Sequence, residues 1–118
     1  MIRGQCHCGA VRFEFDDVPE KLTDCNCTAC RRFAALWAYA DIDKIRILAE
    51  SGATLTYVWG DKSLAFHTCR TCGCTTHWEN LASDGEHMAV NCRMSEPQDI
   101  EGIRIRHFDG AHSWQYLD

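Results

Sequence analysis

The stretch Asp24-Cys25-Asn26-Cys27-Thr28-Ala29-Cys30-Arg31-Arg32 is the part of the sequence around which we expect the rest of the chain to be built. Cys25 and Cys27 lie two residues apart, so on an extended segment their side chains point the same way. Thr28-Ala29 then lets the chain turn and bring Cys30 to the same point. Thiolates are soft ligands that suit zinc, and three of them leave one of its four tetrahedral positions free. The stretch therefore predicts an open zinc site at Cys25, Cys27 and Cys30.

Two further cysteine pairs, each closely followed by glycine, lie on either side of this stretch. They are Cys6-His7-Cys8-Gly9 and Cys69-Arg70-Thr71-Cys72-Gly73. Glycine can adopt the positive φ that turns the backbone of a metal knuckle, and a structural zinc takes four closed ligands. The pairs predict a second, structural zinc at Cys6, Cys8, Cys69 and Cys72, which would tie the first strands to the middle of the sheet. The expected content is two zincs per chain.

Other interpretations of these cysteines remain open at this stage. The first stretch is also compatible with a disulfide plus one spare thiol, or with three buried cysteines that only pack. The two flanking pairs are also compatible with two separate redox pairs. Cys74 and Cys92 are left over, and we expect both to be small buried hydrophobes. Either could instead be the fourth ligand of the open site, Cys74 more readily than Cys92.

Several histidines and arginines are candidates for roles near the open site. His67, His77 and His112 can carry protons, because histidine titrates near neutrality, although most histidines have no such role. Arg31 and Arg32 adjoin the cysteines and can hold the carboxylates of an acidic substrate, or they form a solvated basic pair.

Composition describes one soluble globular domain spanning residues 1–118. Of its residues, 46% are hydrophobic and 25% charged, and no run of eighteen apolar residues predicts a membrane span. With nine cysteines in clusters and no signal-peptide core at the start, we expect a cytoplasmic metal protein rather than a secreted disulfide scaffold. The net charge is −5, and cysteine ligation would make it more negative, which disfavours nucleic-acid binding.

Short alternating segments predict a mainly β fold. Val11, Phe13 and Phe15 alternate with charged residues, as in a half-buried strand. Further strands are expected over 36–40, 45–47, 55–59, 63–68, 75–79 and 87–93, followed by an edge strand near 103–105 and an extended arm. Residues 31–35 allow at most a helical turn or two. Short strands at roughly ten-residue spacing are typical of an all-β sandwich or barrel.

Nearly the whole chain carries four motifs in order: Cys6-His7-Cys8-Gly9-Ala10-Val11, Cys25-Asn26-Cys27-Thr28-Ala29-Cys30-Arg31, Cys69-Arg70-Thr71-Cys72-Gly73 and Asn91-Cys92-Arg93. Together they resemble the glutathione-dependent formaldehyde-activating enzyme family, which also includes centromere protein V. The chain looks like a minimal member. The resemblance implies a β-tent fold of short antiparallel strands, with the closed and open zinc sites at the cysteines named above.

The resemblance also implies a carbon–sulfur lyase reaction at the open zinc, with Cys25, Cys27 and Cys30 as the catalytic site. The reaction joins formaldehyde to glutathione, or a similar small thiol, as S-hydroxymethylglutathione, or cleaves that adduct. Candidate bases are His67, His77 and zinc-bound water. Two rival functions remain: a non-catalytic zinc-binding interaction module, and a zinc or redox sensor that uses Cys74 and Cys92.

Overall fold

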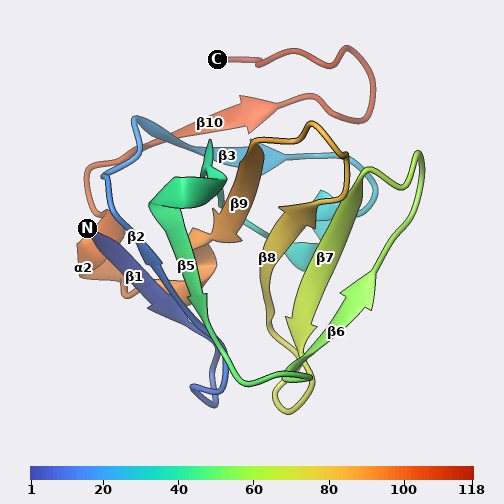
Figure 1. Cartoon of the computed structure of the whole chain (residues 1–118). Helices are drawn as coiled ribbons and strands as arrows, with labels where there is room; N and C mark the ends of the chain where they lie inside the picture. The colour runs from blue at the N-terminus through green and yellow to red at the C-terminus, as the bar shows by residue number, and fades with distance from the viewer.

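The computed structural model describes residues 1–118 and is mainly β, as predicted, with ten strands in two sheets (Figure 1). The smaller sheet has the order β1-β2-β5, formed by β1 (Ile2–Gln5), β2 (Arg12–Phe15) and β5 (Ile45–Leu48). The larger sheet has the order β10-β3-β4-β9-β8-β7-β6. Its strands are β3 (Lys21–Cys25), β4 (Trp37–Asp41), β6 (Thr54–Tyr57), β7 (Leu64–Cys69), β8 (Thr75–Asn80), β9 (His87–Asn91) and β10 (Arg104–Phe108).

Helical structure is limited to single turns. The α-helices are α1 (Cys30–Phe33) and α2 (Pro97–Ile100), and two 3₁₀ segments, η1 (Ile42–Lys44) and η2 (Cys92–Met94), follow β4 and β9. Neither α-helix has the length and apolar character needed to span a bilayer. The short helical segment that the sequence allows after the cysteine stretch is present as α1.

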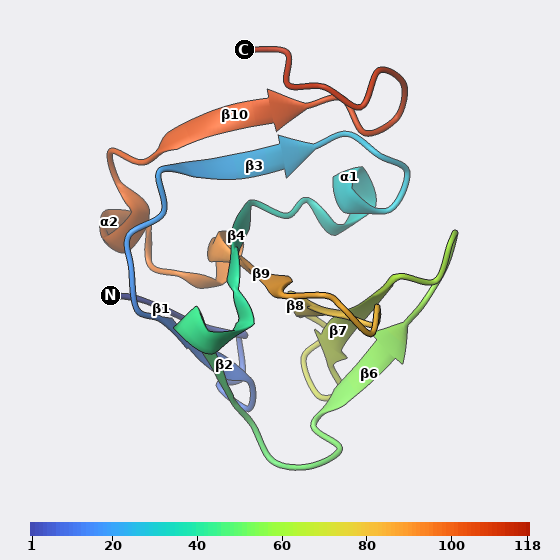
Figure 2. The same ribbon diagram turned by 45° about the horizontal axis from the view of Figure 1, so that its top comes forward.

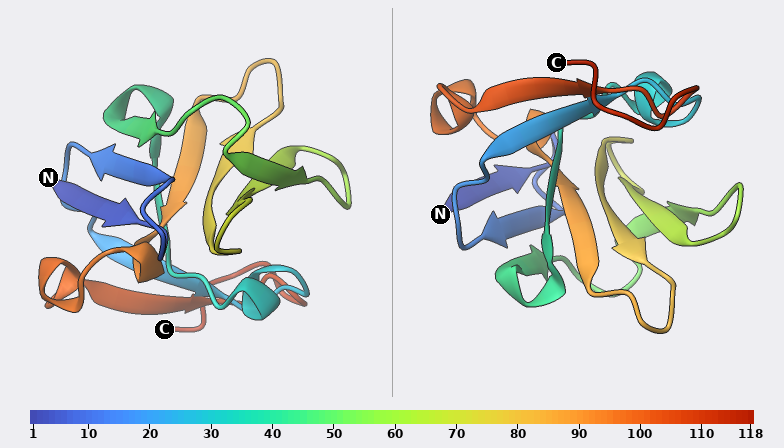
Figure 3. Two further views of the ribbon diagram at one scale, coloured as in Figure 1. Left: turned by 90° about the horizontal axis from the view of Figure 1, so that it is seen from below. Right: turned by 90° about the horizontal axis from the view of Figure 1, so that it is seen from above.

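The β3–β10 pair lies across one end of the larger sheet. These two strands are parallel, with Leu22 opposite Ile105, whereas all other pairs in both sheets are antiparallel. β3 meets β4 at the single pair Thr23–Trp37, so the β3–β10 pair turns away from the remaining strands (Figures 2 and 3). The carboxyl end of β3 therefore projects the cysteine stretch over one side of the sheet.

Most of the strands expected from alternation are present. β10 occupies the edge of the larger sheet, as predicted for the tail, and β9 is buried along four of its five residues. The sequence reasoning missed β3 and α2. In β3, Leu22 and Thr23 are adjacent and both buried. Leu22 belongs to the core, whereas the hydroxyl of Thr23 pairs with that of Tyr116 at 2.8 Å, so no period-two pattern marks the strand.

The main core contains 17 buried residues and joins the two sheets. Its largest fully buried side chains include Trp37, Phe13 and Ile2. A smaller cluster of Cys6, Val11 and Cys69 lies at the other junction between the sheets. Burial of a large apolar side chain contributes about 2 kcal/mol to stability, so the main core is the principal source of folding free energy.

Asn91 connects three strands through its buried side chain, which is 2% exposed. Its Oδ1 accepts hydrogen bonds from the backbone N–H groups of Leu36, at 3.1 Å, and Arg93, at 3.0 Å. Its Nδ2 donates to the carbonyl oxygen of Thr75 at 2.9 Å. This side chain therefore fixes the start of β4 against β8 and β9.

Replacement Asn91→Ala should lower the free energy of unfolding by about 3 kcal/mol, because it leaves buried backbone groups without partners. Asn80→Ala is the matched control, since that side chain accepts one bond, from Ala82 N in an exposed turn, and its loss should cost less than about 1 kcal/mol. Urea denaturation of the two variants measures the difference. Equal losses would show that Asn91 does not join the strands in this way.

Candidate metal centre

The first cysteine cluster brings together four sulfur atoms from the two sheets. The Sγ atoms of Cys6, Cys8, Cys69 and Cys72 all lie within 4.8 Å of one another. Cys6 and Cys8 are 3.7 Å apart, and Cys8 and Cys69 are 3.6 Å apart. In a tetrahedral site with metal–sulfur bonds of about 2.3 Å, neighbouring sulfurs are about 3.8 Å apart. The spacing therefore fits a four-sulfur metal site.

Two glycine-assisted turns position these sulfurs. Gly9 and Gly73 both have φ of +83°, where a side chain would be strained. In the first turn the backbone N–H of Val11 donates to the sulfur of Cys6 at 3.3 Å. In the second, the backbone N–H of Gly73 donates to the carbonyl oxygen of Cys69 at 2.9 Å. The predicted positive φ of Gly9 is confirmed.

The second cluster contains the sulfurs of Cys25, Cys27 and Cys30, which also lie within 4.8 Å of one another. Cys25 ends β3 and Cys30 begins α1, so the chain reverses between them. The sulfur of Cys27 accepts a bond from the backbone N–H of Cys30, and that of Cys30 accepts one from the indole N–H of Trp37, both at 3.3 Å. Such bonds stabilise the thiolate form that binds metal.

In the metal-free cluster the thiols share protons. A hydrogen bond from Cys30 lowers the pKa of the Cys25 thiol to about 6, and the same pairing raises the pKa of Cys30. A bond from Cys30 to a Cys25 thiolate is the hydrogen-bonding cause of both shifts. The cluster therefore carries a negative charge near neutral pH and attracts a cation.

A C-terminal hook, residues 108–116, closes over the second cluster. Asn26 donates through Nδ2 to Asp109 Oδ1 at 2.9 Å and accepts through Oδ1 from the backbone N–H of Ala111 at 3.0 Å. Gly110 lies directly against the sulfurs, since a Cβ there would stand 2.7 Å from Cys25 Sγ. Hydrogen bonds from Asn26 and Ser113 lower the pKa of Asp109 to about 2, so this carboxylate holds the hook in place across the physiological pH range.

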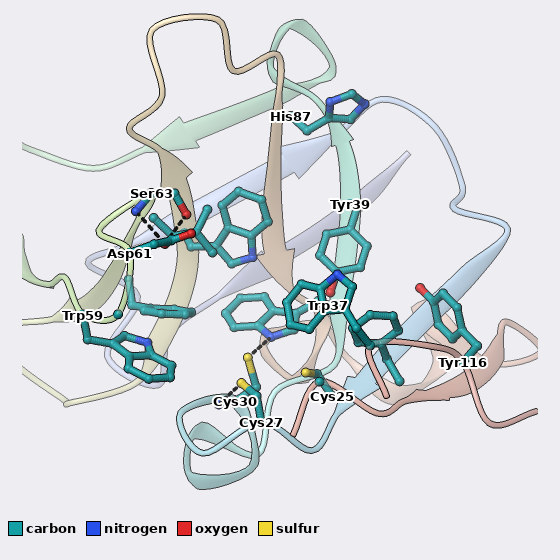
Figure 4. A pocket seen from close by; sticks show the side chains of 17 residues that line it. Cys25, Cys27, Cys30, Trp37, Tyr39, Trp59, Asp61, Ser63, His87 and Tyr116 are labelled. Atoms are coloured by element: carbon teal, nitrogen blue, oxygen red, sulfur yellow. Dashed lines mark hydrogen bonds between the residues drawn. The ribbon is translucent and has the colours of Figure 1, made fainter. Parts of the chain in front are cut away.

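The three sulfurs line a pocket of about 800 Å³ whose walls are mainly aromatic (Figure 4). The sheet contributes Trp37, Tyr39, Phe66 and Trp78. The β6–β7 turn and the hook region contribute Trp59, Phe108, Trp114 and Tyr116. In size and apolar lining the pocket resembles the sites that bind small organic molecules.

Few polar side chains face this pocket. They are Ser63, Asp61, His87 and the tyrosine hydroxyls, and none of the lining residues is a lysine or an arginine. Asp61 Oδ1 accepts bonds from the backbone N–H and the hydroxyl of Ser63, which lower the pKa of Asp61. Desolvation of the hydroxyl raises the pKa of Tyr39, although its side chain is partly exposed, and the neighbouring thiols of the second cluster raise it further. Tyr39 therefore stays protonated beside the sulfurs.

The predicted histidine candidates lie elsewhere. Phe66 and Trp78 oppose each other across β7 and β8 and line the pocket, so the next pair, His67 and His77, faces the other side of the sheet. His67 Nε2 bonds to Glu79 at 2.8 Å, and burial lowers the pKa of His77 to about 3. These two histidines stack with ring centroids 4.3 Å apart and do not reach the sulfurs.

The remaining predicted candidates also lie outside the pocket walls. His112, Arg31 and Arg32 are not among the lining residues, and Arg32 donates to the carbonyl oxygen of Thr28 at 2.8 Å. Cys92 is fully buried, as expected for a small hydrophobe, and Cys74 is half-buried rather than buried. Neither joins a cluster of metal-binding groups.

The aromatic lining was missed by the sequence reasoning. Trp59 was expected to end the strand over 55–59, but β6 stops at Tyr57 and Trp59 lies in the loop that follows it. Trp114 lies in the loop after β10 and belongs to no strand or helix pattern. One part of the lining could have been found from the sequence. Tyr39 lies between Ala38 and Ala40 in a strand, and alternation places it on the face opposite those two alanines.

Comparison with known proteins adds a family and a structural relative. Residues 1–104 match the family described as "Glutathione-dependent formaldehyde-activating enzyme". The fold is similar to the crystal structure of a protein from Rhodobacter sphaeroides, with a TM-score of 0.71 and 29% sequence identity. That similarity covers 88% of this chain and 99% of the other.

Loss of one sulfur should affect stability very differently in the two clusters. The first cluster joins segments about sixty residues apart, whereas the second lies within six residues of one chain segment. In metal-loaded protein, Cys69→Ser should lower the melting temperature by more than about 15 °C, and Cys27→Ser by less than about 5 °C. Thermal unfolding monitored by circular dichroism provides the measurement. The reverse order would contradict a fold-stabilising role for the first cluster.

Proposed function

Because the chain belongs to the glutathione-dependent formaldehyde-activating enzyme family, we propose that it is a zinc-dependent carbon–sulfur lyase acting on hemithioacetal-type thiol adducts. S-hydroxymethylglutathione, the adduct of glutathione and formaldehyde, is the type of substrate that the family description suggests. Residues 1–118 would then form one zinc-binding domain, with a structural zinc at Cys6, Cys8, Cys69 and Cys72. Cys25, Cys27 and Cys30 would hold the catalytic zinc.

One observation carries this proposal: Cys25, Cys27 and Cys30 all line the wall of the pocket. A purely structural zinc site is closed by four protein ligands, whereas a catalytic site has three and an open position. Neither Cys74 nor Cys92 approaches closely enough to supply a fourth sulfur to this group. The open position would therefore face a cavity large enough for a substrate.

The donor set suits zinc, since thiolate sulfurs select soft or borderline metals. When bound there, zinc supplies Lewis-acid stabilisation of a substrate sulfur as its thiolate. The cysteines would set the direction of the open position, and the N–H groups of Cys30 and Trp37 hold two of the sulfurs in orientation. Gly110 leaves room for the hook to cover the cluster without a side chain entering it.

The bond changes are those of a reversible thiol addition to a carbonyl group. In cleavage, the adduct's hydroxyl proton leaves to solvent, its oxygen forms the C=O bond, and the C–S electron pair returns to sulfur. Tyr39 presents its hydroxyl toward the cysteine cluster, where it can donate a hydrogen bond to the substrate oxygen (Figure 4).

Cobalt-loaded protein should report thiol entry at the open position. Adding a small thiol such as 2-mercaptoethanol should intensify and shift the sulfur-to-cobalt absorption bands, and entry should strengthen as pH rises toward the thiol's own pKa. Protein carrying Cys27→Ser is the control and should respond weakly. Formaldehyde release from S-hydroxymethylglutathione above the spontaneous rate should accompany thiol entry in the zinc protein. A spectrum that no thiol alters would refute the lyase and favour the non-catalytic interaction module.

Replacing Tyr39 should impair the chemical step more than binding. Tyr39→Phe keeps the ring but removes the hydroxyl, and loss of one such donor should reduce kcat by about 100-fold with little change in KM. Tyr57→Phe is the matched control, since Tyr57 lies on the exposed edge strand β6 and does not line this pocket. Steady-state kinetics on the adduct separates the two. An unchanged kcat in Tyr39→Phe would remove this residue from the reaction.

A further inference from the structure

We propose that the pocket is selective for thiol adducts whose organic group is aromatic or apolar and carries no carboxylate. This inference rests on the proposed function and specifies its substrate class. It also separates this chain from a preference for glutathione, a tripeptide with two carboxylates.

The charges oppose carboxylates. A carboxylate transferred from water needs cations or N–H donors to replace its hydration. No lysine or arginine lines the pocket, and the acidic group that does line it, Asp61, is ionised. Three thiolates bound to one divalent ion leave a net charge of −1 at the cluster, which adds to the repulsion.

Two basic side chains of the adjoining β3–β10 pair are engaged elsewhere. Arg106 and Lys21 lie over the ring of Tyr116, at 4.2 and 5.3 Å from its centroid, and neither is a lining residue. Arg106 also donates to the carbonyl oxygen of Asp118 at 2.8 Å. Among the lining residues, His87 Nε2 lies 3.2 Å from Asp41 Oδ1, so this side chain is already paired with a carboxylate.

The walls favour aromatic and apolar groups. Trp59 is 40% exposed, Tyr39 is 41% exposed and Trp114 is 71% exposed, although all three belong to the pocket. Their uncovered faces leave apolar surface in contact with water, which a bound aromatic group would remove. A volume of about 800 Å³ accommodates a group much larger than that of 2-mercaptoethanol.

The arrangement places these walls where the organic group of a bound thiol must lie. Cys25, Cys27 and Cys30 lie together at one end of the view, Trp59 and Asp61 are on one side, and Tyr116 is on the other (Figure 4). Trp114 packs edge-on against Phe108, with ring centroids 5.1 Å apart, so the hook holds it at the pocket. A thiol whose sulfur reaches the cysteines extends its organic group between these aromatic rings.

The test compares thiols that share the same reactive group. Benzyl mercaptan and 4-(mercaptomethyl)benzoate both carry a benzylic thiol and differ by one carboxylate, and glutathione is the third ligand. In calorimetric titration of zinc-loaded protein, benzyl mercaptan should have the highest affinity. Each carboxylated thiol should bind at least about tenfold more weakly. Glutathione binding as tightly as benzyl mercaptan would overturn the proposal while leaving thiol entry, and hence the lyase function, intact.

Two variants locate the selectivity. Trp114→Ala should weaken benzyl mercaptan about tenfold but leave 2-mercaptoethanol unchanged, because the small thiol is too short to extend from the cysteines to Trp114. Asp61→Asn should selectively improve binding of 4-(mercaptomethyl)benzoate, and Asp84→Asn, on an exposed turn outside the pocket, should not. Equal effects on all thiols would contradict these roles.

A ligand without a thiol distinguishes the two possible failures. Benzyl methyl sulfide cannot form a thiolate, yet it should still quench tryptophan fluorescence by occupying the aromatic walls, whereas the methyl thioether of 4-(mercaptomethyl)benzoate should do so only at higher concentration. If no thiol enters the cobalt site but this difference is observed, the lyase function fails and the pocket selectivity stands. If the two thioethers bind equally, the selectivity fails, whatever happens at the metal.

Discussion

The rest of the structure depends on the meeting of two cysteine-containing turns, one from each sheet. Cys6 and Cys8 follow β1, whereas Cys69 and Cys72 lie at the end of β7, and their sulfurs meet within 4.8 Å. Four thiolates at that spacing repel one another unless a cation neutralises them, so metal binding and folding are expected to be coupled. Once this junction is fixed, the larger sheet can hold β4, β7 and β8 as the floor of a pocket.

The two clusters are expected to differ in their effect on stability, because their cysteines are separated by very different lengths of chain. A cluster made within one short turn constrains little of the chain, so it can leave a coordination position unused at small cost to the fold. A cluster that joins distant segments stabilises the fold more, because it restricts many more unfolded conformations. The short cluster has a second role through Asn26, which lies between Cys25 and Cys27. Its side chain forms hydrogen bonds to Asp109 and Ala111 and so holds the hook in place.

Local chemistry explains which features the sequence predicted. Both cysteine clusters, the positive φ of Gly9 and most strands could be predicted, because spacing and alternation act within a few residues. The pocket could not, because Trp59 and Trp114 meet the sheet only through the turn after β6 and the hook after β10. The histidines show the opposite failure. Alternation with Phe66 already placed His67 on the other face, but nothing in the sequence said which face held the site.

The order of the parts along the chain bears on how the molecule is made. During synthesis Cys6, Cys8 and the three-cysteine cluster become available first, whereas Cys72 follows roughly 2 to 8 seconds later at ordinary elongation rates. If metal binds during synthesis, five thiols would compete for it before the partners of Cys6 and Cys8 exist. The hook, with Trp114, is added last. A nascent chain that bound metal through Cys6, Cys8 and the three-cysteine cluster would have to exchange ligands once Cys69 and Cys72 are made.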